Sequence, residues 1–112
     1  MSLSTTLTDT AQIVTVNAER IDAAMAIQFK EDMRAETEGG HDRVILDLSS
    51  VEFIDSSGLG AIVAAMKQLG GGRQLDLAGL SPMVEKVFRL TRMDTVFKLY
   101  ATLDEATAAD GR

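Results

Sequence analysis

Cysteine and tryptophan are absent from the 112 residues, and histidine occurs once, as His41. The absence of cysteine excludes disulfide bonds, thiolate zinc sites and cysteine nucleophiles, and it fits a reducing compartment. Because a metal site needs several ligands at suitable spacing, the lone histidine is interpreted as a surface loop residue. The sequence therefore predicts neither a metal site nor a cofactor.

Basic residues and long apolar runs are also scarce. The chain has 11 Lys and Arg but 17 Asp and Glu, which gives a net charge of -6. Since nucleic acid binding usually needs a basic face, we expect no nucleic acid partner, and the same charge disfavours an anionic membrane surface. No apolar run approaches the roughly 20 residues that cross a bilayer, and the N-terminus lacks the features of a signal peptide. We expect a cytoplasmic protein without direct membrane insertion.

The residues that are present suffice for one packed domain, which we assign to residues 1–112. Hydrophobic residues make up 46% of the chain and aromatic residues only 4%, so aliphatic side chains must fill the core. The length is ordinary for a single domain. No linker or low-complexity tract divides the sequence.

Hydrophobic periodicity divides the chain into alternating strands and helices. We expect helices over 23–38, 56–69, from about 82 and from about 103, and strands over 3–8, 13–16, 44–48, 74–78 and 95–100. This β-β-α-β-α-β-α-β-α order predicts an α/β fold with a mixed, mostly parallel sheet of four to five strands and about four helices. Alternating polarity over 74–78 predicts a half-buried strand. Between strand and helix, Val51, Phe53 and Ile54 are expected to plug one end of the core.

Two aspartates precede expected helices, and both suit the N-cap position. Asp22 stands before the helix over 23–38, and Asp55 stands before the helix over 56–69. Sites in α/β sheets collect where strand ends meet helix starts, so the two positions are candidates for function. The pair is interpreted as two N-caps in preference to a site for a divalent cation.

The Asp55-Ser56-Ser57-Gly58 stretch has two interpretations that the local sequence leaves open. It can be a plain helix start, with a capping carboxylate and small polar residues in the first turn. Alternatively, Gly58 and Gly60 strip side chains from the first turn and expose backbone N–H groups, an arrangement suited to an anion.

A hydrolase elbow is the sharpest enzymatic alternative for this stretch. Its G-x-S-x-G motif also sets a serine between strand and helix, and Gly58 follows Ser56 at the right spacing. However, Ile54 stands where the first glycine belongs, and the only histidine precedes the serine, whereas that fold supplies its histidine later. We therefore expect no enzyme and no catalytic residue.

Residues 44–60, VILDLSSVEFIDSSGLG, resemble the signature of the STAS domain, particularly that of bacterial anti-sigma factor antagonists. Eight adjacent residues over 53–60, after an apolar strand, fall in register with that signature. The resemblance extends over about the whole chain. Residues 20–23 (RIDA) are similar to the family's opening of the first helix, and the stretch from Leu80 to Phe88 is similar to its third helix.

The resemblance implies a phosphoprotein that acts by partner switching in signal transduction. The resemblance implies that Ser56 is phosphorylated by a serine kinase that is also the anti-sigma factor. The unphosphorylated antagonist binds this kinase and frees the sigma factor, phosphorylation breaks the complex, and a PP2C-type phosphatase restores it. Transcription is thereby regulated indirectly. The acidic neighbours of the phosphosite and the residues of the docking face would be Asp22, Asp55, Ser57, Gly58, Leu59 and Gly60.

One position departs from the family pattern. Glu19 stands where the family usually has glycine, so the turn is expected to differ and to add charge near the docking face. The alternative function keeps the fold and changes the role: a non-phosphorylated STAS subunit that docks on a membrane transporter or lipid-export ABC ATPase. A small hydrolase is the third class, and it would lose ester turnover on Ser56→Ala.

Overall fold

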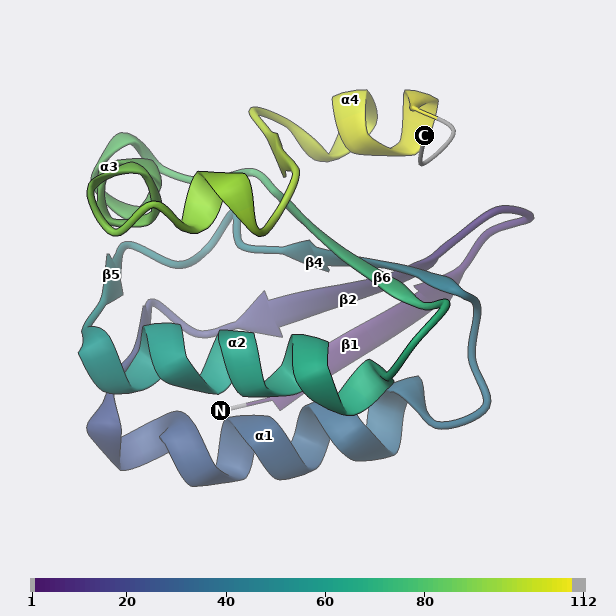
Figure 1. The fold of residues 1–112 in the computed structure, drawn as a ribbon, viewed down its shortest axis with the longest axis horizontal. Helices are drawn as coiled ribbons and strands as arrows, with labels where there is room; N and C mark the ends of the chain where they lie inside the picture. The colour runs from purple at the N-terminus through teal and green to yellow at the C-terminus, as the bar shows by residue number, and fades with distance from the viewer. Residues whose placement is uncertain (1, 110–112) are drawn as a thin grey trace.

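The computed structural model describes residues 2–109, so residues 1 and 110–112 of the expected single domain lie outside it. Seven strands, four α-helices and one 3₁₀ helix follow one another in this part of the chain (Figure 1). In chain order they are β1 (Ser2–Leu7), β2 (Gln12–Asn17), β3 (Arg20–Ile21), α1 (Ala23–Thr37), β4 (Arg43–Asp47), β5 (Phe53–Ile54), α2 (Ser56–Leu69), β6 (Gln74–Ala78), α3 (Pro82–Leu90), η1 (Met93–Thr95), β7 (Leu99–Tyr100) and α4 (Leu103–Ala108).

The main sheet has five strands in the order β1-β2-β4-β6-β7. β1 and β2 form an antiparallel hairpin, while the β2–β4, β4–β6 and β6–β7 pairs are parallel. Figure 1 shows α1 and α2 side by side on one face of this sheet and α4 on the opposite face. The predicted α/β class, with a mixed and mostly parallel sheet and four helices, is confirmed.

Helix starts are the local features that the sequence predicted best. The expected helix over 56–69 coincides with α2, and each α-helix begins after a side-chain cap. In all four, a side-chain oxygen of the cap accepts a hydrogen bond from a backbone N–H in the first turn, as capping requires. The four caps are Asp22, Asp55, Ser81 and Thr102.

The expected strand over 95–100 is wrong in its first half. Arg92 adopts a left-handed backbone with φ of 63°, and the 3₁₀ helix η1 follows it. This turn directs Phe97 into the core, where its ring meets Phe88 edge-to-face at a centroid distance of 6.0 Å. Only Leu99–Tyr100 remains extended and pairs with β6 as the short edge strand β7.

The expected half-buried character of 74–78 is also wrong. The Asp76 side chain is only 1% exposed, and its Oδ2 lies 2.9 Å from Nη2 of Arg43, which is buried as well. Arg43 also donates from Nη1 to the carbonyl oxygen of Ala109 at 3.2 Å, at the end of α4. Asp76 therefore belongs to a buried ion pair and does not face solvent, and the half-buried Gln74 donates to its Oδ1 at 2.8 Å.

The expectation that Phe53 plugs one end of the core is wrong. Val51 and Ile54 are buried as expected, but Phe53 is 38% exposed. Because β5 is a strand and adjacent side chains of a strand point in opposite directions, Phe53 turns outward when Ile54 turns inward. None of the four α-helices within residues 2–109 combines the length and the apolar character that a membrane span requires.

Candidate functional site

A second, two-stranded sheet brings two helix starts together. β3 and β5 pair in parallel, with Arg20 opposite Phe53 and Ile21 opposite Ile54. Each strand is followed by its capping aspartate and then by a helix, so α1 and α2 begin next to each other (Figure 1). Asp22 and Asp55, which lie 33 residues apart in the sequence, therefore flank one small surface.

The Asp55 carboxylate serves both helices. Its Oδ1 accepts from the N–H of Gly58 at 2.8 Å, and its Oδ2 accepts from the N–H of Ala23 at 3.1 Å. Asp22 completes the first turn of α1, since its Oδ1 accepts from the N–H of Ala24 at 3.1 Å. Both aspartates are thus N-caps, as the sequence favoured.

The glycines of the first turn of α2 differ from expectation. A Cβ on Gly58 would lie 2.0 Å from the carbonyl oxygen of Ile21, so this glycine permits the close approach of α2 to β3. Its N–H is occupied by Asp55 and is not exposed for an anion. Gly60 faces open space and has no such packing role.

The predicted site residues divide into a surface group and an inward group. Ser56 and Ser57 are exposed at the start of α2, and Gly60 is exposed one turn later. Gly58 is buried and Leu59 half-buried against the core. Of the two hydroxyls, that of Ser56 directly follows the residue that joins the two helices.

Arg20 and Phe53 are site residues that sequence reasoning missed. The Arg20 guanidinium carbon lies 4.9 Å from the centroid of the Phe53 ring, and Arg20 Nε lies 3.1 Å from Asp22 Oδ2. The Arg20 side chain is 56% exposed. The signal was present in the repeated pattern of residues 20–22 (RID) and 53–55 (FID), in which parallel pairing sets the first residues opposite each other.

Glu19 fits its turn without strain. Its carbonyl oxygen accepts from the N–H groups of Glu52 at 2.6 Å and Phe53 at 3.2 Å, which ties it to β5. Within residues 2–109, Arg92 is the one non-glycine residue with positive φ, so Glu19 needs no left-handed backbone. Glu19 and Glu52 are exposed and add negative charge beside Asp22 and Asp55.

His41 lies too far from Ser56 to act as its base. It follows the C-terminal end of α1, a helix of 15 residues, while Ser56 lies beside the N-terminal end. At 1.5 Å per residue, that helix separates them by about 22 Å. The arrangement therefore lacks the serine–histidine contact that a hydrolase elbow requires.

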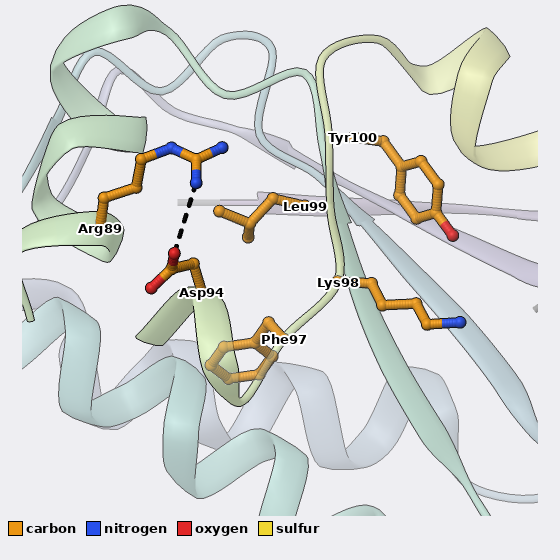
Figure 2. A pocket seen from close by; sticks show the side chains of 6 residues that line it. All are labelled: Arg89, Asp94, Phe97, Lys98, Leu99 and Tyr100. Carbon is orange, nitrogen blue, oxygen red and sulfur yellow. Dashed lines mark hydrogen bonds and ion pairs between the residues drawn. The ribbon is translucent and has the colours of Figure 1, made fainter. Parts of the chain in front are cut away.

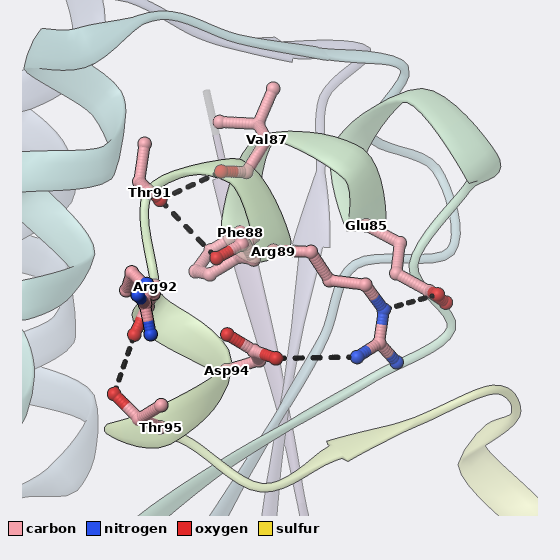
Figure 3. Close-up of polar contacts among 8 residues, drawn as sticks. All are labelled: Glu85, Val87, Phe88, Arg89, Thr91, Arg92, Asp94 and Thr95. Carbon is pink, nitrogen blue, oxygen red and sulfur yellow. Dashed lines mark hydrogen bonds and ion pairs between the residues drawn. The ribbon is translucent and has the colours of Figure 1, made fainter.

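A shallow hollow of about 440 Å³ lies elsewhere, between α3, η1 and β7 (Figure 2). Arg89 donates to Glu85 at 2.9 Å and to Asp94 at 3.3 Å, so its charge is balanced within the protein (Figure 3). The hydrogen bond and charge of Glu85 raise the pKa of Arg89 above its ordinary value. The predicted site residues do not line this hollow, whose lining is Arg89, Asp94, Phe97, Lys98, Leu99 and Tyr100.

Comparison with known proteins gives one consistent family. A sequence model described as "STAS domain" matches residues 2–106. "Putative anti-sigma factor antagonist BtrV" from Bordetella bronchiseptica is 31% identical over 90 residues, which cover 80% of this chain and 78% of that protein. A protein from Thermotoga maritima with the same functional name is 40% identical over 68 residues, or 60% of each chain.

Solved structures agree with this result. The crystal structure of an anti-sigma factor antagonist from Mycobacterium paratuberculosis superposes with a TM-score of 0.84. It is 28% identical in sequence, and the match covers 96% of this chain and 91% of that one.

Proposed function

The chain belongs to the STAS domain family, and we propose that it is an anti-sigma factor antagonist whose partner binding is switched by phosphorylation of Ser56. The single observation that carries the proposal is the position of Ser56. It is exposed at the first residue of α2, directly after the carboxylate that joins the starts of α1 and α2. A kinase can reach this hydroxyl without opening the fold.

The fold tolerates a phosphate at this position. Within residues 2–109, the Ser56 side chain makes no hydrogen bond that modification would break. A phosphate adds about -1.5 to -2 charge and three acceptor oxygens. The effect of modification is therefore a change in the charge and size of the surface, without refolding.

The neighbours of Ser56 make that change costly for a docked partner. Asp22 and Asp55 are held in place by the N–H groups that they cap, so neither carboxylate can turn away without uncapping a helix. A partner that covers the modified surface must desolvate the phosphate beside these carboxylates and tolerate their combined field. Loss of affinity follows.

The proposed partners are an anti-sigma factor with serine kinase activity and a PP2C-type phosphatase that reverses the modification. The protein itself has no enzymatic role in this scheme. Ser56 serves as the acceptor of the phosphoryl group, and both partners reach it from solvent.

To test the proposal, the protein is incubated with ATP and with each candidate kinase encoded beside it. Mass spectrometry then identifies the residue that carries phosphate. The expected result is one phosphate on Ser56, lost in Ser56→Ala and retained in Ser57→Ala, the matched control on the adjacent exposed hydroxyl. Unmodified Ser56 with every such kinase would overturn the proposal and favour the non-phosphorylated docking role.

A further inference from the structure

The two segments that carry the starts of α1 and α2 beside Ser56 contain a single cation. Residues 19–29 and 49–63 contain Arg20 as their only basic residue. The same segments contain four carboxylates, those of Glu19, Asp22, Glu52 and Asp55. A phosphate on Ser56 would therefore add its charge to a region that already carries a net charge of -3, with one guanidinium to balance it.

Arg20 retains unused donor capacity. Its Nε is 3.1 Å from Asp22 Oδ2 and its guanidinium lies over the Phe53 ring, yet more than half of the side chain is exposed. A guanidinium has five N–H donors in a planar fork. In the described part of the chain, its terminal nitrogens form no hydrogen bond with protein, so four donors are available for a second anion.

The pairing of the two short strands links Arg20 to the segment that carries Ser56. Its strand partner is Phe53, three residues before Ser56. The residue after Arg20, Ile21, accepts from the N–H of Asp55 at 3.4 Å, and Asp55 immediately precedes the serine. The planar fork of arginine matches a phosphate bidentately, which a single ammonium group does not.

We propose that Arg20 is the counter-cation of phosphorylated Ser56, and that its guanidinium moves from the Phe53 ring to the phosphate. This inference rests on the proposed function, since it takes Ser56 as the modified residue. The movement would uncover the Phe53 ring and withdraw the cation of the two helix starts from an acidic group of a partner. Phosphorylation then both adds an anion and removes a cation from the docking face.

A titration followed by ³¹P NMR tests the role of Arg20. Phosphoserine is installed at position 56 by genetic code expansion, so the test needs no kinase. A nearby guanidinium favours the dianion, so Arg20→Gln is expected to raise the second pKa of the phosphate by roughly one pH unit. Arg34→Gln, with the same charge change on the exposed face of α1, is expected to leave that pKa nearly unchanged.

The carboxylates of Glu19, Asp22, Glu52 and Asp55 are present in both variants, and Arg20→Gln also releases Asp22 from its ion pair, which acts in the same direction on the phosphate pKa. Equal phosphate pKa values in Arg20→Gln and Arg34→Gln would overturn the role of Arg20. A second measurement does not depend on the variant folding: phosphorylation should shift the ring proton resonances of Phe53 in the parent chain, and unchanged resonances would also overturn it.

These outcomes are separable from a failure of the proposed function. A kinase that leaves Ser56 unmodified contradicts the function and leaves the phosphate titration unaffected. Equal pKa values contradict the role of Arg20 and leave the kinase assay unaffected.

Discussion

Asp55 and Ala23 join two helices that are remote in sequence, because Asp55 Oδ2 accepts the N–H of Ala23 at 3.1 Å across a separation of 32 residues. The other carboxylate oxygen caps the helix to which Asp55 itself leads. The residue immediately before the proposed phosphosite therefore connects the starts of α1 and α2. Its position fixes Ser56 relative to both helices, so loss of function on substitution of Asp55 must be separated from loss of stability.

The two hydrogen bonds of Asp55 predict a graded effect on stability. Asp55→Ala removes both caps and is expected to lower the free energy of unfolding by about 2 kcal/mol, since one cap contributes about 1 kcal/mol. Asp55→Asn keeps one acceptor oxygen for Gly58 but turns an NH₂ group toward Ala23, so about 1 kcal/mol is expected. Urea unfolding followed by circular dichroism measures both. An Asp55→Ala variant as stable as the parent chain would show that these two hydrogen bonds do not stabilise the fold.

The glycines at 58 and 60 predict opposite effects from the same substitution. Gly58→Ala forces a Cβ against the Ile21 carbonyl oxygen and should cost roughly 1–3 kcal/mol, as overpacking does. Gly60→Ala meets open space within a helix and should stabilise by up to about 1 kcal/mol. Thermal unfolding of the two variants measures these effects. Because both substitutions lie on α2, each variant is the control for the other. Similar transition temperatures for both would refute the assignment of Gly58 to packing.

For the buried Arg43–Asp76 pair, we expect the effects of the single substitutions on the free energy of unfolding to be strongly non-additive. Asp76→Leu leaves a buried guanidinium without its partner and is expected to cost roughly 3–5 kcal/mol. The double variant Arg43→Met/Asp76→Leu replaces both charges by apolar groups and should recover most of that loss. A double-mutant cycle by chemical unfolding measures the coupling. Additive losses would show that the two charges do not depend on each other.

Local chemistry made the helix starts predictable from the sequence. A cap involves residues two or three apart, so Ser81 and Thr102 could be recognised without knowledge of the fold. The bounds of α2 followed from its cap and from the glycines that end it. The STAS signature over 44–60 also lies in one continuous stretch, which is why the family could be identified before the structure was known.

Long-range contacts account for what the sequence did not predict. β3 and β5 are two residues each, too short for a periodic pattern, and they exist only because they pair with each other. The Arg20–Phe53 contact depends on that pairing. Asp76 gave a polar signal that normally indicates solvent, and only its partner Arg43, 33 residues away, makes its burial possible.

In the proposed switch, a phosphate on Ser56 weakens docking by its charge. Isothermal titration calorimetry measures this effect. The cognate anti-sigma factor is titrated against the parent chain, Ser56→Ala and the protein with phosphoserine at position 56. We expect Ser56→Ala to bind like the parent chain and the phosphorylated protein to bind at least about tenfold more weakly, a loss of roughly 1.4 kcal/mol or more. Equal Kd values for the parent and phosphorylated proteins would show that the phosphate does not control docking.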